Sequence, residues 1–188
     1  MDTEKKPLRA DARRNYDRLL DEARRAFAAR GVEASLEEIA RNAGVGIGTL
    51  YRHFPTREAL VETVLRERFD EQAAAARELL KSPEPLKALE AWLAGLGKQS
   101  ATYRGLPELM ADVLDDETSP LYASCHAMQD GVSHLVERAK AAGELRADVT
   151  AHELLVLLHA LSWAGEYLSG DKGLDRLLDL VFAGLRVS

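Results

Sequence analysis

The sequence predicts an all-α fold of about nine helices. Almost every segment repeats its apolar residues at steps of three and four, which is the period of a helix that buries one face. No alternating apolar and polar run is followed by a hairpin turn, so nothing in the pattern favours a sheet. The chain has 188 residues, of which 46% are hydrophobic and 30% charged, the balance of a folded globular protein.

Three helices are predicted in the N-terminal third. The first has a regular apolar face and ends at Gly31, because glycine readily takes the left-handed conformation that ends helices. Ser35 and Glu38 have the spacing of a capping box, which opens the second helix, and Gly44 closes it. The expected ranges are 11–30, 35–43 and 46–54.

Six more helices are predicted after Pro55. Thr56 and Ser119 are expected N-caps, and a proline follows Ser119 at the first helical position. Thr150 and Glu153 form a second capping box, and Asp171 is the expected cap of the last helix. The expected ranges are 56–80, 84–103, 108–114, 119–143, 150–168 and 171–186.

Composition excludes several classes of protein. No apolar run approaches the ~20 residues that a membrane span needs. The first residues are charged and have no apolar centre, so no secretory signal is expected. A single cysteine, Cys125, excludes an internal disulfide and a four-cysteine zinc site. We therefore expect a cytoplasmic protein.

Charge is unevenly distributed along the chain, whose net charge is −6. Residues 1–57 carry 12 lysines and arginines against 9 acidic residues, whereas residues 58–188 carry 13 against 22. This asymmetry indicates that only the N-terminal third meets a polyanion, although ordinary surface charge explains it equally well.

The segment 35–54 has the pattern of a helix-turn-helix motif, because two short helices meet at a glycine-containing turn. Leu50 and Phe54, four residues apart on the second of these helices, are expected to point inward with Val45. A helix whose outer side combines small residues, a hydroxyl, a phenol and a guanidinium fits the major groove of DNA. These outer positions are Gly48, Thr49, Tyr51 and Arg52.

The run Gly-Thr-Leu-Tyr-Arg-His-Phe at 48–54, followed by Pro-Thr-Arg-Glu-Ala-Leu, resembles the DNA-binding module of the TetR family of bacterial transcriptional regulators. The resemblance covers about residues 9–65. It implies that Ser35 and Arg57 contact phosphate, with Arg13 and Arg14 as weaker candidates. It also implies a recognition helix whose contacts to bases and nearby phosphates come from Ile47, Gly48, Thr49, Tyr51 and His53. Tyr51 and His53 are equally compatible with packing inside the module.

Position 47 departs from the family pattern. Many relatives carry a lysine, a serine or another polar residue at positions 46 and 47, where this chain has Gly46 and Ile47. An isoleucine cannot hydrogen-bond a base edge, but it can pack on a thymine methyl group.

The last two predicted helices, 151–168 and 171–186, are unusually apolar. The first of them is apolar on nearly all sides, so it needs partners on more than one side. A four-helix interface between two copies would supply them, and a central core within one copy is the alternative. The resemblance also implies a homodimer through these helices, which would read a pseudo-palindromic operator.

A small-molecule effector pocket is expected in the C-terminal part. Aromatic, methionine and a few polar side chains line such pockets, but they also build ordinary cores. The candidates are Trp92, Leu96, Tyr103, Met110, Met128, His159, Trp163, Glu166 and Tyr167. No cofactor is expected. His126, Asp130 and His134 share a helix face and have metal-ligand spacing, but a solvated polar stripe is the expected interpretation, so no metal site is predicted.

These observations lead to one hypothesis and two alternatives. The hypothesis is a homodimeric repressor with a DNA-binding domain over residues 9–65 and an effector-binding and dimerisation domain over residues 66–188. The alternatives are a small helical enzyme that uses the middle cavity and a dimeric adaptor with a vestigial DNA module. Specific DNA binding distinguishes the repressor from both.

Overall fold

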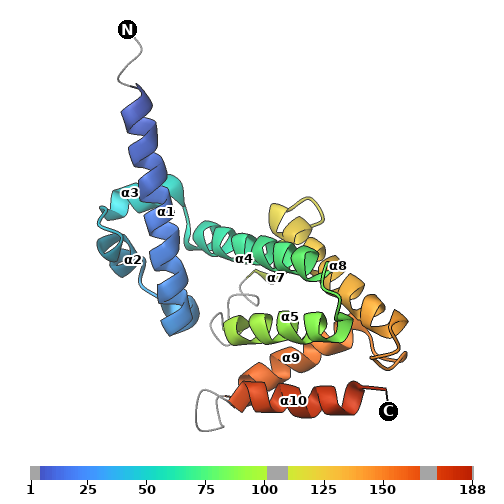
Figure 1. The fold of residues 1–188 in the computed structure, drawn as a ribbon. Coiled ribbons are helices and arrows are strands. Elements are labelled where there is room, and N and C mark those ends of the chain that lie inside the picture. Colours follow the sequence, from blue (N-terminus) through green and yellow to red (C-terminus); the bar gives the residue numbers. More distant parts are fainter. Residues whose placement is uncertain (1–4, 101–109, 166–172, 188) are drawn as a thin grey trace. The chain divides into compact units, whose positions relative to one another are not determined.

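The computed structural model describes residues 5–100, 110–165 and 173–187, and this part of the chain is helical (Figure 1). The predicted all-α fold is therefore confirmed. No helix among these residues combines the length and apolarity that crossing a bilayer requires. The elements are α1 (Lys5–Arg30), the 3₁₀ turn η1 (Gly31–Glu33), α2 (Leu36–Asn42), α3 (Ile47–His53), α4 (Arg57–Leu79), α5 (Pro85–Ser100), α7 (Ala111–Leu114), α8 (Pro120–Ala141), α9 (Ala151–Gly165) and α10 (Gly173–Leu185).

The helices pack as two units. Unit 1 holds the described residues up to Leu65 together with residues 110–112, and unit 2 holds residues 66–100 and those from Val113 onward. Helix α4 begins in unit 1 and ends in unit 2.

Unit 1 is built on the apolar face of α1. Leu19, Ala23 and Phe27 are fully buried there, and α2 packs against both α1 and α3. Gly31, at the end of α1, has φ +58°, the left-handed conformation predicted for the helix stop. The resulting turn sends the chain back along α1, so that α2 and α3 lie beside it (Figure 1).

Several predicted caps are present at the helix ends. The Thr56 hydroxyl accepts a hydrogen bond from the Ala59 N–H at 3.1 Å, and the Ser119 hydroxyl accepts one from the Leu121 N–H at 3.0 Å. The capping box at Thr150 is complete: its hydroxyl accepts from the Glu153 N–H at 3.2 Å, and its own N–H donates to the Glu153 carboxylate at 2.8 Å. The order and the starts of these helices thus follow from local side-chain chemistry.

Some predicted boundaries were wrong. Helix α1 is described from Lys5 and not from residue 11. Pro7 is compatible with this earlier start, because a backbone N–H in the first turn of a helix has no partner within the helix. The helix predicted at 108–114 is only Ala111–Leu114 in the described residues. The last helix is described from Gly173, and its predicted cap, Asp171, lies outside the described residues.

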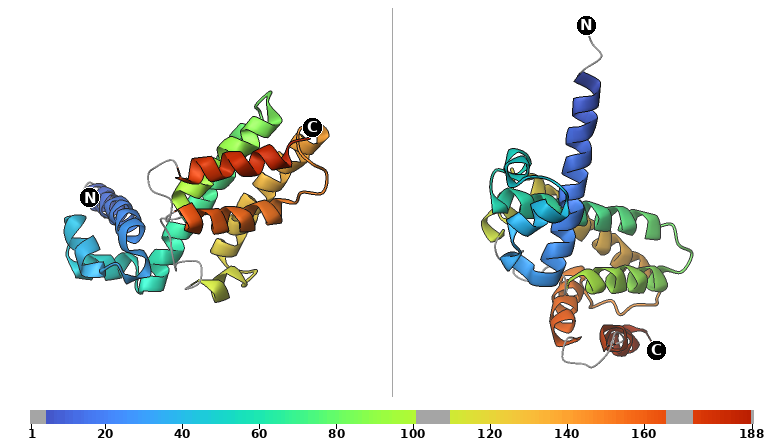
Figure 2. Two further views of the ribbon diagram at one scale, coloured as in Figure 1. Left: turned by 90° about the horizontal axis from the view of Figure 1, so that it is seen from below. Right: turned by 90° about the vertical axis from the view of Figure 1, so that its left-hand side faces the viewer.

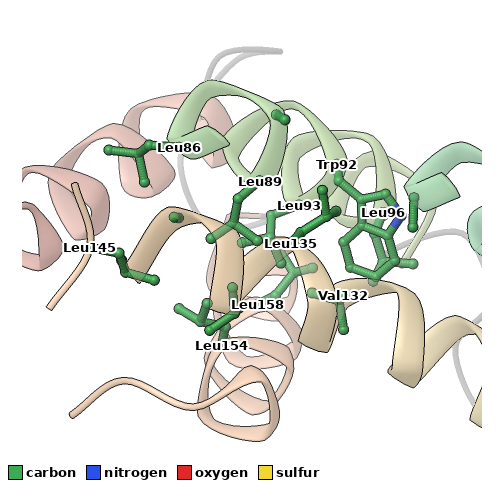
Figure 3. Packing of buried hydrophobic residues seen from close by; sticks show 14 of the residues in the cluster. Leu86, Leu89, Trp92, Leu93, Leu96, Val132, Leu135, Leu145, Leu154 and Leu158 are labelled. Atoms are coloured by element: carbon green, nitrogen blue, oxygen red, sulfur yellow. The ribbon is translucent and has the colours of Figure 1, made fainter. Parts of the chain in front are cut away.

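The core of unit 2 lies between α5, α8, α9 and α10. Leu89, Trp92 and Leu93 of α5 face Leu135 of α8 and Leu158 of α9, and all five are at most 2% exposed (Figure 3). Helices α9 and α10 pack against each other, and both views in Figure 2 show them as neighbours. Burial of these side chains is the main source of stability for this unit.

The C-terminal end of α10 is fixed to the rest of unit 2 by backbone and side-chain bonds. Leu145 and Arg186 form an isolated antiparallel bridge, in which the Arg146 N–H donates to the Leu185 carbonyl at 3.0 Å. The Arg186 guanidinium also pairs with Glu90 of α5 at 2.8 Å. These bonds hold α10 in register with α5 and with the loop after α8.

The crossing of α4 and α8 is unusually close at Gly131. A Cβ atom built on this glycine would lie 2.7 Å from the Cβ of Ala76, which is fully buried on α4. Gly131→Ala is therefore expected to force the helices apart and to lower the free energy of unfolding by about 1–3 kcal/mol, as overpacking does. Urea denaturation measures this loss.

Gly95→Ala is the matched control for this prediction. Gly95 lies in α5 with nothing within 4 Å of a built Cβ, so alanine there is expected to stabilise by roughly 0.5–1 kcal/mol through its better helix propensity. Equal changes in the two variants would contradict the close crossing.

Candidate nucleic-acid interface

Two seven-residue helices, α2 and α3, meet at a tight turn. Gly44 has φ +70°, and a Cβ atom there would lie 3.3 Å from the Arg18 guanidinium, so the turn requires glycine. The Val45 N–H donates to the Ala40 carbonyl at 3.0 Å and thereby ends α2. Gly46 then takes an extended conformation as the N-cap of α3. This is the geometry of a helix-turn-helix motif.

The two faces of α3 differ sharply in burial. Leu50 and Phe54 are at most 2% exposed and hold the helix on the unit 1 core. Ile47 is 37% exposed and Tyr51 is 45% exposed, on successive turns of the opposite side. Gly48 and Arg52 are also exposed, whereas Thr49 is half-buried. The inward positions of Leu50 and Phe54 and the outward positions of Gly48, Tyr51 and Arg52 are as the helical period predicted, whereas Val45, predicted to point inward, and Thr49, predicted to lie on the outward side, are both half-buried.

His53 and Tyr51 have different surroundings. From the sequence, both were equally compatible with contacting DNA and with packing inside the module. The half-buried His53 ring packs edge-on against the ring of Tyr16, with centroids 5.8 Å apart. Tyr16 also stacks on Phe54 at 5.3 Å, so one aromatic residue of α1 contacts both residues at the end of α3. Tyr16 therefore helps to hold the C-terminal end of α3 in place, a role that the sequence does not reveal because the contacts join two separate helices.

Most arginines of unit 1 make an ion pair or a hydrogen bond within the protein. Arg13 pairs with Asp17 at 3.1 Å, Arg14 pairs with Asp11, and Arg24, Arg25, Arg30 and Arg41 also pair with acidic residues. Arg18 donates to the Asn15 side chain, and Arg57 donates to a backbone carbonyl. Among the arginines between residues 11 and 65, only Arg52, on the exposed side of α3, makes no hydrogen bond or ion pair with a described residue.

Ser35 caps α2, but the rest of its predicted capping box is wrong. Its hydroxyl accepts from the Glu38 N–H at 3.3 Å, yet the Glu38 carboxylate pairs with Arg30 and Arg41 instead of returning to Ser35. The hydroxyl itself donates to Glu37 at 3.0 Å. A backbone N–H and this hydroxyl lower the pKa of Glu37, so a negative charge lies beside Ser35 at neutral pH.

Arg57 connects the start of α4 to the segment before α2. One of its guanidinium N–H groups donates to the Ala34 carbonyl at 2.7 Å, across 23 residues of sequence. Ala34 is fully buried and lies immediately before Ser35, so this bond fixes the entry to the helix-turn-helix motif.

The residues predicted to line an effector pocket lie in different places. Trp92, Leu96 and Met128 belong to the buried core of unit 2, and the Trp92 indole N–H donates to the Gln72 carbonyl at 3.0 Å. Met110 is buried but belongs to unit 1, and His159 is exposed on α9. Tyr103, Glu166, Tyr167 and the side chain of Trp163 lie outside the described residues.

A cavity of only about 10 Å³ lies between α5, α9 and α10, among Leu93, Leu154, Leu161, Leu178 and other apolar side chains. That volume holds at most one water molecule. The effector candidates are absent from its lining.

The polar side of α8 has its own local contacts. The ring of His126 stacks on Tyr122, with centroids 3.8 Å apart, and its Nδ1 lies 3.0 Å from the Tyr122 carbonyl. No three histidine, cysteine or acidic side chains come together as a metal site within the described part of the chain. Burial raises the pKa of the Cys125 thiol.

Large apolar side chains are exposed on α9 and α10. Val156 is 56% exposed, Leu157 is 36% exposed and Leu180 is 61% exposed. Exposed aliphatic residues gathered on two adjacent helices are typical of an interface.

Comparisons with known proteins agree with this geometry. Residues 19–64 match the family model described as bacterial regulatory proteins of the tetR family, and residues 84–187 match the C-terminal domain of SbtR-like transcriptional regulators. An HTH-type transcriptional regulator of Staphylococcus aureus is 39% identical over 64 residues. That match covers 34% of this chain and only about a third of the curated relative, 35% of its length.

Two solved structures match nearly the whole chain. A TetR regulatory protein from Mycobacterium vanbaalenii is 35% identical, with a TM-score of 0.69 and coverage of 96% of this chain and 100% of its own. A TetR transcriptional regulator from Streptomyces coelicolor is also 35% identical, with a TM-score of 0.70 and coverage of 92% and 98%. Both family models describe transcriptional regulators, not enzymes. The chain belongs to the TetR family of DNA-binding transcriptional regulators.

Proposed function

We propose that this protein is a repressor that binds a pseudo-palindromic operator as a homodimer and responds to a small-molecule effector. The exposed side of α3 carries the proposal, because Ile47, Tyr51 and Arg52 project from a helix whose other side is buried. A rigid helix with an unpacked outer face is what insertion into the major groove requires.

We assign the DNA contacts to the N-terminal domain, residues 9–65. Ile47, Gly48, Thr49 and Tyr51 would face bases, and Arg52 would offer an unpaired cation to a base or a phosphate. His53 would contact the DNA only at its edge, since its ring already packs on Tyr16. Ser35 and Arg57 would contact phosphate from either side of the motif.

Arg57→Ala is expected to weaken binding to every DNA sequence about equally. Loss of one phosphate contact lowers the slope of log K against log salt by ~1 in each half-site. The same change removes the bond to the Ala34 carbonyl, so the thermal midpoint also falls. Arg57→Lys is the control, because lysine keeps the charge for phosphate. Loss confined to a single base pair of the operator would contradict this role.

We place dimerisation on α9 and α10 of the C-terminal domain, residues 66–188. Val156 and Leu180 expose more than half of their surface on helices that lie side by side. A second copy packed about a two-fold axis would bury both and complete a four-helix arrangement. The same axis would present two copies of α3 to the two half-sites.

Light scattering of the purified full chain tests this assembly. The wild type is expected to have the mass of a dimer, alone and on operator DNA. Leu180→Arg is expected to shift it to a monomer, whereas Ala127→Arg, on an exposed position of α8, is expected to leave the dimer intact. A wild-type monomer, or a dimer unaffected by Leu180→Arg, would contradict the proposed interface.

We propose that the effector enters the C-terminal domain near Trp92, Leu96 and Met128. These side chains are packed together in the core, so a ligand would have to displace that packing. The ligand would change operator affinity only through unequal affinity for two states, shifting the region of α1 and α4 and with it the spacing of the reading helices. A typical coupling free energy between effector and DNA binding is ~1–3 kcal/mol. A ligand screen on the operator complex would detect it as a roughly 5- to 150-fold change in DNA affinity.

A further inference from the structure

Ile47 and Tyr51 are the two large hydrophobic side chains that stay exposed in the described part of unit 1. They lie four residues apart, so they share one side of α3 and form a continuous apolar strip. By contrast, Leu50 on the same helix and Phe54 just after its end are buried.

The two residues beside Ile47, Gly46 and Gly48, have no side chains, and the space next to them is open. A Cβ atom built on Gly46 or on Gly48 would meet nothing within 4 Å, so glycine is not required there by packing. Neither residue has a side chain that competes with Ile47 for contact with a ligand. Ile47 is therefore the one exposed side chain among residues 46–49, and the backbone on either side of it can approach a partner closely.

An aliphatic side chain selects among base pairs by one feature only. In the major groove the base edges offer hydrogen-bond donors and acceptors, and thymine alone adds an apolar group, its C5 methyl. Contact with that methyl removes apolar surface of both partners from water, whereas contact with an N–H or a carbonyl would leave a polar group unpaired.

We infer that Ile47 is a specificity-determining residue that reads the C5 methyl group of a thymine in each operator half-site. This inference rests on the proposed function, since it requires α3 to enter the major groove. The Tyr51 ring, one turn further along α3, extends the same apolar strip and helps to exclude water from the contact.

Deoxyuridine substitution tests this inference directly, because it removes the methyl group and keeps every hydrogen-bonding atom of thymine. The full chain is first used to select its binding sequence from random duplex DNA, and each thymine of that sequence is then replaced in turn. One position per half-site is expected to weaken wild-type binding about four-fold, and both positions together about fifteen-fold. If no position changes the affinity by as much as two-fold, the inference is wrong while specific DNA binding stands.

Two variants assign the methyl contact to Ile47. Ile47→Ser removes its methyl groups at an exposed helix position, so the sensitive deoxyuridine probe and the thymine probe are expected to bind this variant equally. Ile47→Val keeps two methyl groups and is expected to keep the discrimination. A four-fold difference that persists in Ile47→Ser would show that another residue reads the methyl and would overturn the assignment.

A further probe separates the methyl group from the rest of thymine. At the sensitive position, 5-methylcytosine presents the same methyl on a cytosine–guanine pair. The wild type is expected to bind the 5-methylcytosine probe about four-fold more tightly than the cytosine probe, and Ile47→Ser is expected to bind both alike. Equal wild-type affinities would contradict methyl recognition. Failure to select any sequence with an intact dimer would instead contradict the proposed function.

Discussion

Trp92→Ala is expected to lower the free energy of unfolding by about 3–5 kcal/mol, the typical loss when a large buried aromatic residue is truncated. Trp92, on α5, is 2% exposed in the core of unit 2, at the end of the cluster where Leu96 and Val132 also lie (Figure 3). Its removal would leave a cavity beside Leu96 and Val132 that the surrounding helices cannot fill by small shifts. Urea denaturation followed by circular dichroism measures the change, with the slope against urea expected to stay constant.

Trp92→Phe is the control, because phenylalanine keeps most of the apolar volume and loses the indole N–H. This change removes the hydrogen bond from the indole N–H to the Gln72 carbonyl together with a little apolar volume, and the expected loss is a smaller one of about 1–3 kcal/mol. A loss below about 1 kcal/mol for Trp92→Ala would mean that the indole borders open space, which would favour a preformed pocket over a packed core.

Tyr51→Ala is expected to weaken specific operator binding by about 1–3 kcal/mol in each half-site, the usual value for a base-reading contact. The Tyr51 side chain is 45% exposed and makes no hydrogen bond with a described residue, so its removal is expected to leave folding nearly unchanged. Titration of labelled operator with each protein measures the loss, and thermal melting confirms that the variant is folded.

Tyr51→Phe separates the two parts of the side chain. Full affinity in this variant would assign the contact to the ring, and the same loss as in Tyr51→Ala would assign it to the hydroxyl. Unchanged affinity of Tyr51→Ala would contradict the placement of α3 as the recognition helix.

The fold could be predicted because most of its helix ends depend on neighbours in sequence. Thr56, Ser119 and the Thr150–Glu153 box each use bonds that span two or three residues, and all are present. The box at Ser35 was only half right, since Glu38 is drawn away by Arg30 from the end of α1. A tertiary ion pair of this kind leaves no local signal.

The division of α3 into a buried and an exposed side was also predicted from local sequence. The helical period alone separates Leu50 and Phe54 from the exposed side of α3. It does not separate Tyr51 from His53, because the difference comes from Tyr16 on another helix. Arg13 and Arg14 differ from this case, because their acidic partners Asp17 and Asp11 lie on the same helix; this local pairing leaves Arg52 as the better candidate for a DNA contact.

The position of an effector pocket stays a prediction. Apolar residues at helical spacing line cores and pockets alike, so Trp92, Leu96 and Met128 met the criteria for both and lie in the core. Met110 met them too, yet it is buried in unit 1. Only packing of distant segments distinguishes these cases.

Binding of the full-length protein to DNA tests the central claim most directly. The probe is DNA from immediately upstream of its own gene or a sequence selected from a random pool, titrated at two salt concentrations against scrambled competitor. Saturable binding that survives the competitor and weakens as salt rises is predicted, because base contacts give the specificity and phosphate contacts give the salt dependence. If an intact dimer retained no sequence from the random pool, α3 would not be a reading helix and the proposed repressor function would be contradicted.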